Sequence, residues 1–168
     1  MTDYSPWVEN DQIARRAQEA FTRHGLDTIR TPKDLEQLVT TIGGKPVEIH
    51  LVDRVGMETT TGYWIELPEV QRITLRKNDR PFYQTRSLHH EFAHIIMNHP
   101  RCVGHNSDPS TVTPDAASSV VDGALSRSIQ DFESSEDAES EGEAECLAGL
   151  IAKALLHPTY LDDERIFG

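Results

Sequence analysis

Apolar residues recur at helical spacing in two stretches near the start of the chain. From Trp7 to Arg23 they return every three or four positions with charged residues between them, which predicts a first helix that ends before Gly25. A second helix is predicted over 32–43, because Thr31 can cap its amino end and Pro32 suits the first helical position. The apolar stripe of this second helix consists of Leu35, Leu38, Val39 and Ile42.

The periodicity then changes from helical to alternating. Val47, Ile49 and Leu51 alternate with polar residues, which predicts a strand. Two further strands are predicted over 63–67 and 72–76, and the short connection between them favours a hairpin. Together these segments predict a small, mostly antiparallel sheet of about three strands.

A third helix is predicted from Phe82 to Asn98, with Pro81 in place to begin it. It contains an HExxH motif, in which His90, Glu91 and His94 are the fixed residues. Side chains four apart lie on one helix face, so the two imidazoles can bind one Zn²⁺. Glu91 is then placed to take a proton from a water molecule at that ion, which makes it the candidate catalytic residue.

The histidine face of this helix is not expected to face solvent. Ala93 and Met97 flank the two histidines, so the helix is apolar on two sides and a further element should cover it. The opposite face is also apolar, and we interpret His99, which falls on that side, as a structural residue. The members of that opposite face are Leu88, Phe92, Ile95, Ile96 and His99.

The cover is expected from a last helix over 136–156. Glu141, Glu145, Ala148 and Ala152 fall in one row at i, i+4, i+7 and i+11, and the small residues allow another helix to come close. A catalytic zinc ion takes three protein ligands, and two His with one Glu is a standard set. We therefore predict Glu141 as the third ligand and Glu145, one turn on, as the acceptor of an N–H from a ligand histidine.

The order of these elements predicts an α+β fold in a single domain spanning 1–168. N-terminal helices precede the sheet, and the HExxH helix packs with the C-terminal Glu-bearing helix. The segment 101–133 is rich in Ser, Thr, Pro, Asp and Gly and is expected to be a partly mobile insertion, with a short helix over about 120–129.

Composition narrows the class of protein. The 168 residues are 37% hydrophobic and 26% charged, which is typical of a globular chain, and the net charge of −12 argues against direct nucleic-acid or membrane-surface binding. Much of the acid lies between Asp131 and Glu145. Two cysteines are too few for a disulfide framework, and the first residues lack the features of a signal peptide, so a cytoplasmic location is expected.

The two motif segments together resemble a known family. His90-Glu-Phe-Ala-His-Ile-Ile-Met-Asn-His99, followed by Glu141-Gly-Glu-Ala-Glu-Cys-Leu-Ala-Gly149, is similar to the ImmA/IrrE family of bacterial zinc metallopeptidases, and Leu155-Leu-His-Pro158 is similar to the end of that motif. The resemblance implies a gluzincin-like α+β fold with one catalytic Zn²⁺. It implies His90, His94 and Glu141 as the metal ligands and Glu91 as the catalytic acid/base.

The chain departs from the family pattern in three places. The gap between His94 and Glu141 is longer than usual, and position 145 holds Glu where the family has Asn or Asp. Counting back from Pro158 would make Glu145 the ligand instead. The fuller match over Glu141-x-Glu-Ala-Glu-x-Leu-Ala-Gly favours Glu141, and both registers stay open on the sequence.

The resemblance also implies a function. It suggests a hydrolase that cleaves a protein or peptide substrate, such as a helix-turn-helix repressor, at a specific site in bacterial or phage regulation. Residues 7–44 lack a basic second helix, so any contact with DNA is assigned to the partner. The alternatives are a zinc-containing binding module of a regulatory pair with little proteolysis, which the presence of Glu91 disfavours, and metal-dependent hydrolysis of a non-peptide substrate.

Overall fold

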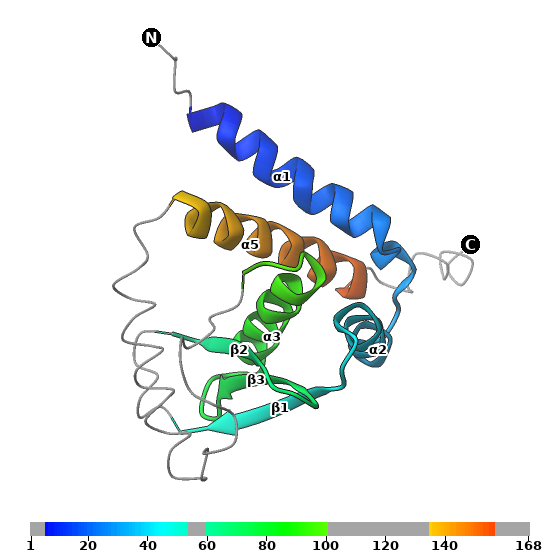
Figure 1. Cartoon of the computed structure of the whole chain (residues 1–168), viewed down its shortest axis with the longest axis vertical. Helices are drawn as coiled ribbons and strands as arrows, with labels where there is room; N and C mark the ends of the chain where they lie inside the picture. The colour runs from blue at the N-terminus through cyan, green and yellow to red at the C-terminus, as the bar shows by residue number, and fades with distance from the viewer. Residues whose placement is uncertain (1–5, 54–59, 101–134, 157–168) are drawn as a thin grey trace, which may run out of the picture.

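The structure is a computed structural model that describes residues 6–53, 60–100 and 135–156 (Figure 1). The predicted insertion at 101–133, with its short helix at about 120–129, lies outside these residues. None of the helices in the described ranges is long and apolar enough to cross a membrane. The elements, in chain order, are α1 (Pro6–Arg23), the short 3₁₀ helix η1 (Leu26–Thr28), α2 (Pro32–Gly43), β1 (Val47–Val52), β2 (Gly62–Glu66), β3 (Gln71–Arg76), α3 (Pro81–Ile96) and α5 (Ser135–Leu156).

The α+β class is confirmed, and the predicted helices form close to their expected bounds. The start of α2 shows why local sequence is sufficient there. The backbone N–H of Asp34 donates to Thr31 Oγ1 at 3.1 Å, and the backbone N–H of Thr31 donates to the Asp34 carboxylate at 2.9 Å. This reciprocal pair satisfies two amide groups that would otherwise lack a partner at the helix end.

The sheet is mixed, so the expectation of a mostly antiparallel sheet was only partly right. The predicted hairpin is confirmed, because β2 and β3 pair antiparallel with Trp64 opposite Ile73. The strand order is β1-β3-β2, however, and β1 pairs parallel to β3 with Ile49 opposite Ile73. An alternating pattern indicates which face of a strand is buried, but not its neighbour or direction.

The elements stack in layers in the order α1, α5, α3 and sheet, with α2 beside α3 (Figure 1). The central position of α5 explains why Ala144, Leu147 and Ile151 are fully buried. Gly142 lies against α1: a Cβ atom there would sit 3.1 Å from Ile13 Cδ1. Gly142 therefore lets α1 pack closely on one side of α5, and Glu141 reaches α3 on the other.

Candidate metal centre

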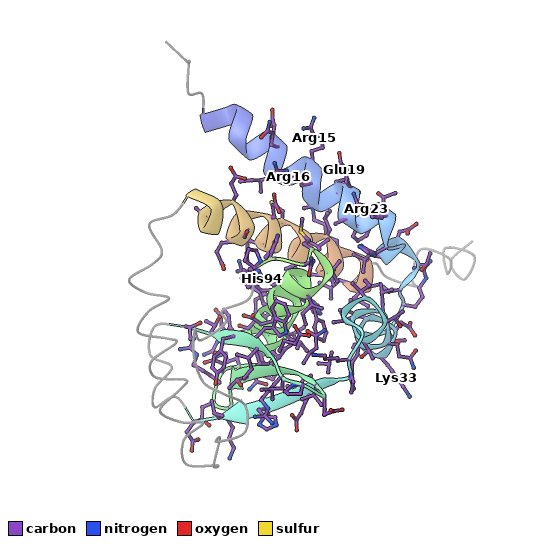
Figure 2. The ribbon with its side chains drawn as sticks, viewed as in Figure 1. Arg15, Arg16, Glu19, Arg23, Lys33 and His94 are labelled. Atoms are coloured by element: carbon purple, nitrogen blue, oxygen red, sulfur yellow. The ribbon has the colours of Figure 1, made fainter. Side chains whose placement is uncertain are left out.

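The histidines of the HExxH motif face α5, as the sequence predicts (Figure 2). His90 and His94 lie one turn apart on α3, and their ring centroids are 4.7 Å apart. Glu141 approaches from the first part of α5. Its Oε2 lies 3.1 Å from His90 Nε2, and its Oε1 lies 3.4 Å from His94 Nε2. The two Nε2 atoms are 3.0 Å apart, and one ligand atom from each of the three residues lies within 4.8 Å of the other two.

These separations fit a metal ion. Ligand atoms bound to zinc at about 2.0–2.1 Å and at tetrahedral angles lie ~3.3 Å from one another. The two nitrogens are 3.0 Å apart, and each has a different oxygen of Glu141 near it, at 3.1 Å from His90 and 3.4 Å from His94, so these spacings are close to that value. His90, His94 and Glu141 thus form a group that could hold a metal ion, and among the described residues this is the group with that geometry.

In the metal-free protein the same three residues shift one another's pKa values. Burial raises the pKa of Glu141, but hydrogen bonds with His90 and His94 outweigh it and hold the pKa far below its ordinary value. Burial lowers the pKa of His90, but the hydrogen bond to Glu141 and the nearby carboxylates bring it above its ordinary value. The cluster is therefore built for positive charge, whether a proton or a metal ion supplies it.

The centre is partly open to solvent. The Glu141 side chain is 41% exposed, whereas those of His90 and His94 are 21% and 12% exposed. An ion held by these three residues would therefore be reached from the Glu141 side, with the imidazoles forming the more enclosed wall. Partial access of this kind is what a catalytic metal site needs, because it must leave a position for water or substrate.

Glu91 is buried next to this group, with only 7% of its surface exposed. Burial raises the pKa of its carboxyl, while the charges of His94 and His90 act in the opposite direction. The start of β2 lies beside it, since a Cβ atom at Gly62 would be 3.4 Å from Glu91 Oε1. That hypothetical atom would also lie 2.9 Å from Leu75 Cδ2, so only glycine fits without a shift of its neighbours.

Glu145 lies one turn further along α5, at the edge of the centre. Its Oε2 is 3.5 Å from His90 Nδ1, and its other oxygen forms an ion pair with Arg86. Glu141, rather than Glu145, is the carboxylate grouped with both imidazoles. The expected role of Glu145 as a hydrogen-bond acceptor for a ligand histidine stays a prediction, because 3.5 Å is long for such a bond.

His99 has a polar environment that the sequence did not indicate. It is buried, as expected, but its Nδ1 lies 2.9 Å from His94 Nδ1 and its Nε2 lies 3.0 Å from Glu143 Oε2. The helical projection placed it on the core side because it assumed that α3 continues to Asn98. Instead α3 ends at Ile96, and Asn98 adopts a left-handed conformation with φ of 52°, which redirects the residue that follows.

The helical pattern of the sequence gives no signal for the contact between His99 and Glu143. Glu143 stands two positions after Glu141, so on a helix the two side chains point about 200° apart and do not share a face. Nothing in the helical pattern therefore links Glu143 to the metal centre. Its link depends on the turn at Asn98, which carries His99 to the far side of His94.

Comparison of this chain with protein-family models, with curated proteins and with solved structures found no match.

Proposed function

We propose that this protein is a zinc-dependent metallopeptidase, as its resemblance to the ImmA/IrrE family suggests. The observation that carries the proposal is the grouping of two imidazole nitrogens of α3 with the Glu141 carboxylate of α5, at nitrogen–nitrogen and nitrogen–oxygen separations of 3.0 to 3.4 Å. The residue after the first histidine adds a buried carboxylate beside this group. A purely structural zinc site closes with four ligands and needs no such carboxylate. A site with three ligands, partial access and a nearby base favours hydrolysis.

The residues of the chain divide the chemistry between them. His90, His94 and Glu141 would hold the ion, which supplies Lewis acidity that activates water near neutral pH and polarises a carbonyl group. Glu91 accepts the proton of the attacking water and returns it to the leaving amine. Burial suits Glu91 to both steps, because it raises the pKa of the carboxyl toward the operating pH, where one group can both take up and return a proton.

An extended peptide has a place to bind beside this centre. Within the described residues β2 pairs only with β3, so its outer edge offers unpaired backbone groups to an added strand. The start of β2 at Gly62 lies against Glu91, so a peptide on that edge would pass the catalytic carboxylate. We propose a cytoplasmic protein or peptide substrate, such as a helix-turn-helix regulator, and the net charge of −12 leaves DNA contact to that partner.

The test compares the wild type with Glu91→Gln, a variant of nearly the same shape that cannot accept the proton. Both proteins, loaded with zinc, are incubated with a library of peptides from a bacterial proteome, and new termini are identified by mass spectrometry. We expect cleavage by the wild type, a loss of about 10²- to 10⁴-fold in kcat/KM in the variant, and unchanged zinc content.

Three outcomes contradict the proposal. Full activity in Glu91→Gln would remove Glu91 from the mechanism, and cleavage that survives removal of zinc by a chelator would remove the metal. A wild type that binds one zinc ion but leaves both the library and its partner regulator intact would instead support the zinc-containing binding module.

A further inference from the structure

A buried chain of polar contacts runs away from the metal centre behind His94. It passes from His94 Nδ1 to His99 Nδ1 over 2.9 Å, and from His99 Nε2 to Glu143 Oε2 over 3.0 Å. The other oxygen of Glu143 accepts a hydrogen bond from Arg16 Nη1 at 2.8 Å. Arg16 belongs to α1 and points toward α5 (Figure 2), so three helices contribute to what we call the His94 chain, namely His94, His99, Glu143 and Arg16.

The contacts of the His94 chain determine which ring nitrogen carries the proton in each histidine when both are neutral. Glu143 pairs with Arg16 and acts as an acceptor, so the hydrogen in its contact with His99 must be on His99 Nε2. A neutral His99 then has a free lone pair on Nδ1, which accepts a hydrogen bond from His94 Nδ1–H. With its proton on Nδ1, a neutral His94 has its lone pair on Nε2, the atom that a metal ion would bind and that faces His90 Nε2 at 3.0 Å. The contact of His94 Nε2 with Glu141 is then a hydrogen bond only when His94 is protonated.

We propose that His99, held by Glu143, is a positioning residue that fixes the ring orientation and tautomer of His94 before a metal ion binds. This inference rests on the proposed zinc site and extends it to residues that do not touch the ion. A partner on the second ring nitrogen is the usual way in which proteins orient a histidine ligand, but here a second histidine stands between the ligand and the carboxylate.

The two proposed ligand histidines differ in the hydrogen-bond partner of their second ring nitrogen. His90 Nδ1 has Glu145 Oε2 at 3.5 Å, and the side chain of Glu145 is half exposed. The side chains of His99 and Glu143 are only 7% and 9% exposed. Contacts in a buried site are less screened by water, so the fixed orientation should matter more for His94 than for His90.

The test uses His99→Leu, which fills the buried space without hydrogen bonds, and His99→Gln, whose amide can both accept from His94 and donate to Glu143. His89→Leu is the matched control, because His89 is a buried histidine of α3, the helix that carries His94, with an exposed fraction of 6%. Among the described residues no hydrogen bond or ion pair joins His89 to the His94 chain. Folding of each variant is checked by circular dichroism. Zinc affinity is measured by competition with a chromophoric chelator.

We expect His99→Leu to bind zinc about 10- to 100-fold more weakly than the wild type, the effect typical of an outer hydrogen-bond partner. His99→Gln should recover part of this loss, and His89→Leu should bind like the wild type. A second readout needs no metal: ¹⁵N NMR of the metal-free protein, at a pH where the histidines are neutral, should show His94 with its proton on Nδ1 in the wild type. The share of that tautomer should fall in His99→Leu.

The outcomes separate this inference from the proposed function. If the wild type binds zinc and His99→Leu binds it equally well, the positioning role is wrong while the zinc site stands. The same conclusion follows if the His94 tautomer is unchanged in His99→Leu. If the wild type itself binds no zinc, the proposed function fails and the positioning role fails with it.

Discussion

At the scale of single residues, neighbouring positions in the HExxH motif have opposite environments. His90 is partly exposed and surrounded by carboxylates, so its pKa is raised over the opposing effect of burial. Glu91, the next residue, is buried and its carboxyl pKa is raised because burial disfavours the charged form. One helical step of about 100° therefore separates the proposed ligand from the proposed base, which is why adjacent residues can have different environments.

The choice of third ligand can be tested by two single substitutions. Glu141→Ala removes a carboxylate whose two oxygens lie 3.1 Å from His90 and 3.4 Å from His94, so zinc affinity should fall by more than the roughly 10- to 100-fold typical of an outer partner. Glu145→Ala removes a half-exposed group at 3.5 Å from His90 and should change affinity by less than about 10-fold. Zinc titration of both purified variants measures this. A large loss in Glu145→Ala with a small one in Glu141→Ala would mean that the register is wrong.

At the scale of elements, the local sequence determines where some helices begin, whereas tertiary contacts determine where others lie. The start of α2 is specified by Thr31 and Asp34, which are close in sequence and satisfy each other. The place of α5 instead depends on contacts with helices far away along the chain: Gly142 meets Ile13 of α1, and Glu141 meets His90 of α3. The stability of α2 should therefore depend on its cap, and the position of α5 should depend on the helices that it contacts.

The capping contact gives a prediction about stability alone. Thr31→Ala removes the hydroxyl that accepts from the Asp34 amide and should lower the free energy of unfolding by about 1 kcal/mol. Urea denaturation followed by circular dichroism measures the change. Zinc affinity should stay at the wild-type value, because Thr31 lies outside the metal centre. Thr31→Ser keeps a hydroxyl and serves as the control, and an equal loss in both variants would show that the hydroxyl is not the cause.

At the scale of the whole molecule, the proposed metal ion would join two helices that the sequence keeps apart. The HExxH motif ends at His94 and the proposed third ligand is Glu141, with a long segment between them. A bond to both helices forms only in the folded chain, so the free energy of metal binding adds to the free energy of folding. The layers of α1, α5 and α3 should therefore be more stable when zinc is present.

Zinc should raise the melting temperature in a pH-dependent way. At free zinc of 100 times Kd the added stability is about 2.7 kcal/mol, which corresponds to roughly 5–10 °C in Tm for a chain of this size. The gain should shrink as the pH falls through the range in which the histidines take up protons, because a ligand imidazole must be neutral. The raised pKa of His90 places the beginning of that loss above the ordinary histidine value of 6.5.

In the metal-free protein, the contribution of His90 to stability should change with pH in the opposite direction. A pKa that is raised in the folded state means that protonated His90 stabilises the fold, and this contribution is lost as the pH rises through the folded-state pKa. Calorimetry from pH 5 to pH 8, with zinc or with a chelator, measures both trends. His90→Gln should remove the contribution of His90 to each of them. A zinc effect that is the same at every pH would contradict the assignment of histidine ligands.

The sequence by itself determined the features that depend on near neighbours. The spacing of His90 and His94, the cap at Thr31 and the hairpin of β2 and β3 could all be predicted, because each involves contacts within a few residues or a single helix face. The small residues of α5 also indicated that another helix packs closely against it. The expected candidate ligands Glu141, His90 and His94 do meet in the structure.

Only the tertiary structure decided the features that depend on distant neighbours. The parallel pairing of β1 with β3 could not be predicted, because alternation fixes the buried face of a strand but not its partner. The contact of His99 with His94 and Glu143 depends on the left-handed turn at Asn98 and on the exact seat of α5 against α3. Such contacts arise when helices pack, and no periodicity within one segment encodes them.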